Sequence, residues 1–136
     1  MSITYAISPD EGLVRAYASG IVRADHLQSF LDSLLADAAF VPGLRGLYDA
    51  RFAEPDITIL QLAEVAAKVT RLIARGLGRV AIVGQSVNTI RVSKTFAVLA
   101  RAVGIDVDVF EDLSEAEAWL KEPGRGDDSG QWRLQP

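Results

Sequence analysis

The chain has 136 residues, a formal net charge of −4, 49% hydrophobic and 24% charged residues, one histidine and no cysteine. The length and the proportions of hydrophobic and charged residues indicate one globular domain. The negative net charge argues against a nucleic-acid-binding surface. The lack of cysteine excludes disulfides, thiolate metal sites and cysteine nucleophiles, and it fits a cytoplasmic protein.

The first two predicted elements form a hairpin. Residues 3–8 alternate apolar and polar side chains, as a strand does, and Pro9 and Gly12 are typical of the turn that follows. Residues 13–19 predict a second, antiparallel strand. One side of this strand carries small residues that let a helix pack closely, namely Val14, Ala16 and Ala18.

The middle of the chain predicts a helix, a strand and a longer helix. Asp25 is a plausible N-cap for the first helix, and residues 44–50 predict the third strand. The second helix is expected to begin near Asp56 or Thr58 and to run to about Arg75, with Gly76 at its C′ position. Both helices have an apolar stripe with helical spacing: Leu27, Phe30, Leu31, Leu34 and Leu35 in the first, and Leu62, Val65, Ala66, Val69, Leu72 and Ile73 in the second.

The last third has the order strand, loop, helix, strand, helix, which indicates a parallel α/β arrangement. The strands are expected at residues 80–83 and 105–110, with a helix at 89–103 between them and a last helix capped by Ser114. We therefore predict a mixed, mostly parallel sheet of about five strands flanked by about four helices. Residues 1–121 form this domain, and residues 122–136 are expected to be a flexible tail.

Three segments in this order give the chain a likeness to a known family. They are Leu47-Tyr48-Asp49-Ala50-Arg51, Gly78-Arg79-Val80-Ala81-Ile82-Val83, and Val109-Phe110 followed by Glu115-Ala116-Glu117-Ala118-Trp119-Leu120. The chain resembles the STAS domain of anti-sigma factor antagonists, and more closely the bacterial STAS-like group described as similar to them. The resemblance implies a mixed sheet with helices, no shared catalytic residue and a regulatory role.

This resemblance implies a non-catalytic regulatory or protein-interaction module. Such a module should show a flat or shallow apolar patch. The alternative is a carrier for a small anionic or lipid-like ligand, because the STAS-like group is often placed with the CRAL-TRIO lipid-binding domains. A carrier should contain a closed cavity, commonly of about 300 Å³ or more.

The resemblance also identifies Thr58 as a candidate for regulatory phosphorylation. Phosphorylatable antagonists have Asp-Ser-Ser-Gly at the start of the second helix, where this chain has Asp56-Ile57-Thr58-Ile59. Thr58 falls on the phosphorylated serine, but isoleucines replace the first serine and the glycine. The same residues are a good helix start. We expect Thr58 to be unmodified and to act as a cap.

Residue types associated with catalysis are sparse. His26 is the only histidine, so a catalytic triad or a histidine-based metal site is not expected. The loop Gly84-Gln85-Ser86-Val87-Asn88 is neither a nucleophile elbow nor a phosphate-binding P-loop. We predict no enzymatic activity, no metal and no cofactor. We also expect no membrane span, because no apolar run approaches the roughly 18 residues that a span needs.

The same loop is the best candidate for a ligand site. It joins a parallel strand to a helix N-terminus, where backbone N–H groups and the helix dipole favour anions. Ser86, Asn88 and Arg91 would contact the ligand, and Asp49 and Arg51 follow the neighbouring strand at the same edge of the sheet.

A second interpretation of this loop involves no ligand. Arg91 would then form an ion pair with Asp49 or Glu54, and Asn88 or Thr89 would serve as an ordinary cap.

The second helix is apolar beyond its core stripe. Ile57, Ile59, Leu60, Ala63 and Ala67 leave little polar surface near its N-terminal half. Contiguous exposed apolar surface usually marks an interface. We therefore predict a twofold homodimer through the second or the third helix, and a regulatory protein partner.

Overall fold

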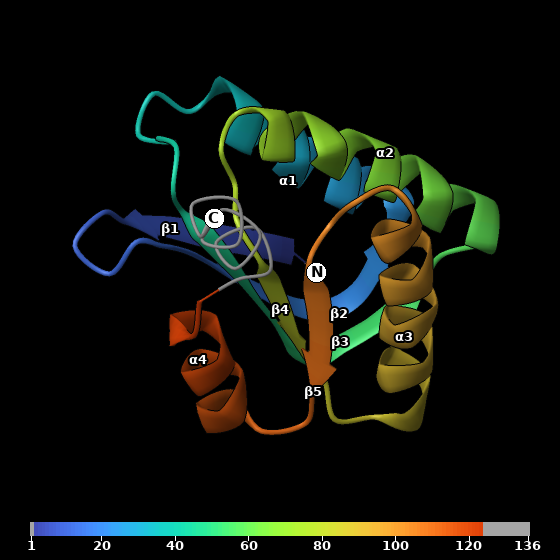
Figure 1. Cartoon of the computed structure of the whole chain (residues 1–136). Coiled ribbons are helices and arrows are strands. Elements are labelled where there is room, and N and C mark those ends of the chain that lie inside the picture. Colours follow the sequence, from blue (N-terminus) through green and yellow to red (C-terminus); the bar gives the residue numbers. More distant parts are fainter. Residues whose placement is uncertain (1, 124–136) are drawn as a thin grey trace, which may run out of the picture.

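The computed structural model describes residues 2–123 and contains a sheet of five strands flanked by helices (Figure 1). In chain order the elements are β1 (Ser2–Ser8), β2 (Leu13–Arg23), α1 (Ala24–Ala36), β3 (Arg45–Asp56), α2 (Ile59–Ala74), β4 (Val80–Val83), α3 (Val87–Ala102), β5 (Val107–Phe110) and α4 (Leu113–Lys121). The predicted α/β fold class is confirmed. No helix of the described part is long and apolar enough to cross a bilayer.

The strands lie in the sheet in the order in which they occur along the chain. β1 and β2 form the predicted antiparallel hairpin, and β2 to β5 are parallel to one another. Helices α1, α2 and α3 cover one face of the sheet and α4 covers the other (Figure 1). The sheet therefore has one face with three helices and one face that α4 covers only in part.

Strands β2 and β3 extend well beyond their predicted ends at residues 19 and 50. Their pairing is irregular between Tyr17 and Ser19, then resumes and continues to Arg23 opposite Asp56. The pairing of β3 with β4 stops much earlier, at Asp49 opposite Val83. The ends of β2 and β3 thus project past β4 as a two-stranded ribbon, in which one edge of β3 pairs with no other strand of the described residues and tolerates Pro55.

Three helices begin earlier than predicted because a different residue caps each. Arg23, not Asp25, is the N-cap of α1, and the Arg23 backbone N–H donates to the His26 ring at 2.9 Å. Ser86 caps α3, and Asp112 instead of Ser114 caps α4. The Ser86 and Asp112 side chains accept hydrogen bonds from backbone N–H groups of the first turn, whereas the Arg23 side chain makes no such cap bond.

The core face of α3 consists of small residues, flanked by the partly buried Val92, Phe96 and Leu99. Val103, beyond the helix end, is 54% exposed. The fully buried residues are small ones: Thr89, Ser93, Ala97 and Ala100. Small side chains let α3 approach the sheet closely, and the larger apolar groups then pack on either side.

Candidate functional site

Hydrogen bonds at the start of α3 tie this helix to the long strand β3. The Ser86 hydroxyl accepts from the Thr89 backbone N–H at 3.0 Å and donates to Thr89 Oγ1 at 2.8 Å. Thr89 Oγ1 in turn donates to the Ala53 carbonyl of β3 at 2.9 Å. Gly84 is needed here, because a Cβ at this position would lie 2.8 Å from Thr89 Cγ2. These hydroxyls therefore hold the loop in place.

A second set of contacts joins Asn88 to β3. Asn88 Nδ2 donates to Glu54 Oε2 at 3.0 Å and to the Pro55 carbonyl at 3.3 Å. Hydrogen bonding by Asn88 lowers the pKa of Glu54 below its ordinary value. Arg91 donates to Asn88 Oδ1. The expected ion pair of Arg91 with Asp49 or Glu54 is therefore wrong for the described residues: Glu54 is bonded to Asn88 instead.

Asp49 and Arg51 form a separate pair on the α4 face of the sheet. Arg51 Nε lies 2.9 Å from Asp49 Oδ1, and Arg51 Nη2 lies 2.8 Å from Asp49 Oδ2. The Arg51 guanidinium also lies 5.6 Å from the centre of the Phe52 ring, which neighbours Tyr17. Because strand side chains alternate between faces, Asp49 lies on the side of Leu47, away from α3.

The candidate ligand residues therefore form two groups. Ser86, Asn88 and Arg91 contact one another or the same helix turn, and Asp49 pairs with Arg51 elsewhere. No hydrogen bond or ion pair within residues 2–123 joins the two groups. Binding of one anion by all of these side chains remains a prediction, and it would require breaking bonds that they already make.

The Asp49–Arg51 pair predicts a pH-dependent contribution to stability. Burial of the Asp49 carboxylate acts to raise its pKa. Hydrogen bonds from the Arg51 side chain and backbone, together with the positive charge of Arg51, have the larger opposite effect and hold the pKa of Asp49 below 3.8. A carboxyl group whose pKa is lower in the folded than in the unfolded state stabilises the fold at pH values above its unfolded-state pKa. This stabilisation is lost as the pH falls through the folded-state pKa. Asp49→Asn should therefore lose less stability than the wild type between about pH 6 and pH 3.

Urea unfolding at both pH values measures this difference. Asp10→Asn, which changes an exposed turn residue, is the matched control and should follow the wild type. Equal pH dependence of the wild type and Asp49→Asn would contradict the prediction.

Thr58 has the capping role that the sequence predicts. Its hydroxyl accepts from the Gln61 backbone N–H at 3.2 Å, and the Gln61 side chain accepts from the Thr58 backbone N–H at 2.9 Å. The two bonds form a capping box at the start of α2. That Thr58 is unmodified stays a prediction.

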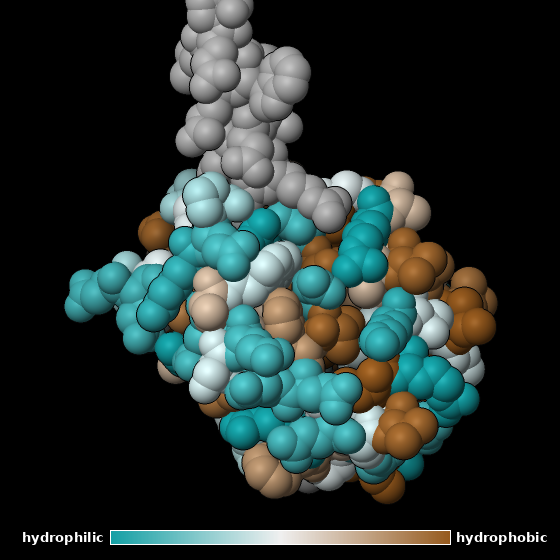
Figure 2. Space-filling model, turned by 60° about the horizontal axis from the view of Figure 1, so that its bottom comes forward, coloured by the Kyte–Doolittle hydropathy of each residue, from teal (hydrophilic) through white to brown (hydrophobic). Residues whose placement is uncertain are grey.

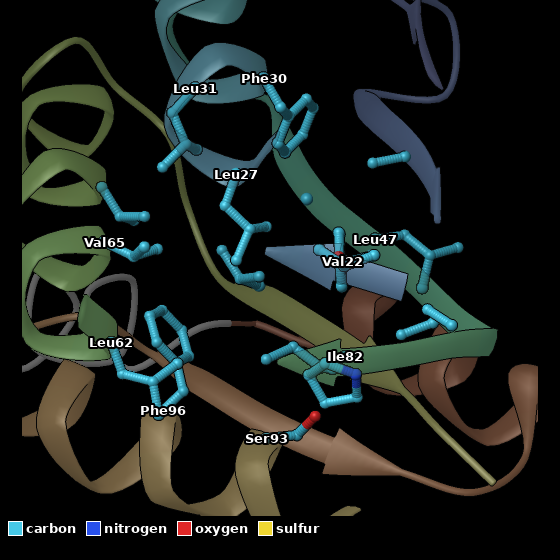
Figure 3. A pocket seen from close by; sticks show the side chains of 18 of the residues that line it. Val22, Leu27, Phe30, Leu31, Leu47, Leu62, Val65, Ile82, Ser93 and Phe96 are labelled. Carbon is cyan, nitrogen blue, oxygen red and sulfur yellow. The ribbon is translucent and has the colours of Figure 1, made fainter. Parts of the chain in front are cut away.

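Two hollows accompany these contacts. A shallow groove of about 570 Å³ runs along the outer side of α3, and its lining includes Arg91. A buried cavity of about 140 Å³ lies between the sheet and helices α1 to α3 (Figure 3). Sequence reasoning missed the cavity. On the face that Figure 2 shows, hydrophobic groups are interspersed with hydrophilic ones.

No group of three His, Cys, Asp or Glu side chains is placed to hold a metal ion within the part of the chain that the structure describes. The expected tail at residues 122–136 lies, from residue 124 onward, outside the described residues.

Fold and site together define a mixed α/β domain whose polar edge is organised by structural hydrogen bonds. A sequence model of the SpoIIAA-like family matches residues 13–121, and the chain belongs to this family. A similar solved structure is an uncharacterised protein of the DUF3478 family from Shewanella loihica PV-4, which has a SpoIIAA-like fold. The two chains share 21% identity over 88% of this chain and 94% of the other, with a TM-score of 0.59. No curated protein matches the chain.

Proposed function

We propose that this protein is a small, non-catalytic cytoplasmic module that regulates by protein contact and works as a twofold homodimer through α2. The observation that carries the proposal is a stripe of exposed residues along the outward face of α2. The polar side chains at the sheet edge support a non-catalytic role, because Glu54, Asn88, Ser86 and Thr89 hold the loops together.

The outward face of α2 is suited to pack against another helix. Its stripe consists of exposed residues one turn apart: Leu60, Glu64, Ala67, Arg71 and Ala74. Leu60 is 72% exposed, and its neighbour Ile59 is 67% exposed. Exposed apolar side chains beside small ones allow close helix approach and mark a contact surface.

The stripe is complementary to itself in an antiparallel pair. With the twofold axis at Ala67, Leu60 of one copy lies over Ala74 of the other. Glu64 then lies beside Arg71 of the second copy, and symmetry repeats both contacts. The outer side of α3 lacks this property, because its exposed residues between Val87 and Val98 include both Arg91 and Lys94. We therefore favour α2 over α3.

Reversing one charge of the stripe should weaken the dimer. Glu64→Arg or Arg71→Glu places like charges together twice across the axis. Each of the two exposed pairs then changes from about 0.5 kcal/mol of attraction to about 0.5 kcal/mol of repulsion, so the dissociation constant should rise roughly thirtyfold. The double variant Glu64→Arg/Arg71→Glu restores opposite charges and should recover the wild-type constant. Sedimentation equilibrium should show a species of twice the chain mass of 14.7 kDa.

Lys94→Glu on α3 is the matched charge reversal outside the stripe and should leave the dimer unchanged. A monomer at tens of micromolar would reject the homodimer. Weakening by Lys94→Glu, with no effect of the α2 variants, would move the interface to α3.

A further inference from the structure

The buried cavity lies between the sheet and the helices of its more heavily covered face. Its volume is about 140 Å³. Large apolar side chains of α1 and α2 form its roof, as Figure 3 shows for Leu27, Phe30, Leu31, Leu62 and Val65. Protein interiors seldom contain continuous space much larger than a water molecule, so this volume is a specific feature of the fold.

Small residues of the central strands leave this space open. The part of the sheet below the cavity includes Ala16 of β2 and Gly46, Ala50 and Ala53 of β3. Leucines and phenylalanines on the opposing helices do not reach far enough to fill the volume that these small residues leave. The cavity thus arises where small strand residues face a helix layer of ordinary side chains.

The lining carries no charge. It contains no acidic, lysine, arginine or histidine side chain among the described residues. Burial raises the pKa of the Tyr48 phenol above its ordinary value of 10.0, so Tyr48 is neutral as well. An ion would lose its hydration here without a partner, so the cavity selects a neutral molecule.

The Ser93 hydroxyl lies on the cavity wall and makes no bond to the described part of the protein. Ser93 is 9% exposed and lines the cavity, and its hydroxyl forms no hydrogen bond with another residue of the described chain. Figure 3 shows its oxygen directed inward, toward the side of Ile82. The nearby Thr89 hydroxyl, by contrast, is fully used by Ser86 and Ala53. No fully buried side-chain oxygen of the described residues lacks a partner, so the Ser93 oxygen keeps some accessible surface, and it can bond a ligand in the cavity.

The volume limits the size of that ligand. An apolar protein cavity of about 150 Å³ accommodates benzene, whereas drug-sized ligands occupy roughly 300–1,000 Å³. A complete lipid therefore does not fit. The lining residues Pro55 at the end of β3, Ile57 before α2 and Val92 of α3 are partly exposed, so the wall of the cavity reaches the surface near them.

We propose that this cavity binds a compact, neutral molecule with one apolar ring or short branched chain and one polar group that hydrogen-bonds to Ser93. The site is separate from the outward face of α2, so it does not depend on the proposed dimer. It adds a small-molecule input to a module whose contact surface lies on the other side of the same helix.

Phenol and benzene are matched probes, because they differ by a single hydroxyl. Each is titrated into the full chain to about 10 mM, above the roughly millimolar dissociation constant that so few atoms can reach. Methyl NMR shifts report binding. Both probes should saturate and should shift the lining residues Leu31, Val65 and Ile82.

Two variants test the assignment. Ser93→Ala should weaken phenol about fivefold, the effect of one lost hydrogen bond, and leave benzene unchanged. Ala50→Val should reduce binding of both probes by filling the space. Ser33→Ala, the same change on the exposed side of α1, is the control and should alter neither affinity.

The proposal is overturned if neither probe saturates with the wild type, or if the shifts map outside the cavity. An equal effect of Ser93→Ala on phenol and benzene would remove the role assigned to the hydroxyl. If Ala50→Val does not fold, the comparison of the two probes in Ser93→Ala decides the question.

Discussion

Gly76→Ala is expected to lower the free energy of unfolding by about 3 kcal/mol, through backbone strain and a steric clash that add together. Gly76 follows the C-cap of α2 with φ of +103°. Its N–H donates to the Ile73 carbonyl and the Leu77 N–H donates to the Leu72 carbonyl, the pattern of a Schellman motif. A Cβ on Gly76 would lie 2.5 Å from Pro42 Cα, a backbone atom that cannot move aside cheaply.

Gly104→Ala is the matched control. Gly104 occupies the same position after α3, has φ of +89° and makes the same pair of backbone bonds, but a Cβ there would meet nothing within 4 Å. Its expected loss is about 1–2 kcal/mol, from the left-handed conformation alone. Urea unfolding followed by circular dichroism measures both variants. Equal losses would show that the Pro42 contact relaxes and that only backbone strain matters.

These two glycines show what the sequence can and cannot predict about the fold. The apolar stripe of α2 ends just before Gly76, so a local pattern predicts both the helix end and the glycine conformation. The contact of Gly76 with Pro42 joins separate segments, and no local pattern contains it. For the same reason the extension of β2 and β3 was not predicted, because it depends on pairing between strands that a helix separates.

The candidate site was predictable only in part. The order of strands and helices places Asp49 beside the end of β4, where the loop before α3 begins, but Asp49 lies within β3, which continues to Asp56. It does not say which face each side chain occupies, and alternation along β3 directs Asp49 to the α4 side. The cavity was missed because its small residues, such as Ala16 and Ala50, look like ordinary close-packing positions. Only their placement opposite the α1 and α2 side chains creates the space.

Arg79→Ala is expected to cost about 3 kcal/mol, the usual effect of removing one member of a buried charged pair. Arg79 is 6% exposed. Its Nε lies 3.3 Å from Asp106 Oδ2, and its Nη1 donates to the Trp119 carbonyl at 2.8 Å. The guanidinium also lies 4.0 Å from the Trp119 ring centre, within cation–π range. Alanine would leave Asp106 and the last turn of α4 without these contacts.

Arg101→Ala separates the effect of burial from that of the bonds. Arg101 makes the same two kinds of contact. Its Nη2 lies 3.3 Å from Asp108 Oδ1 and donates to the Val107 carbonyl at 2.8 Å. Its side chain is 43% exposed, so water replaces the lost contacts, and the expected cost is below about 1 kcal/mol. Arg79→Lys should fall between the two, since lysine keeps the charge but lacks the planar group that lies over Trp119. Chemical denaturation of all three variants tests this order, and equal costs for Arg79→Ala and Arg101→Ala would mean that burial adds nothing to the Arg79 contacts.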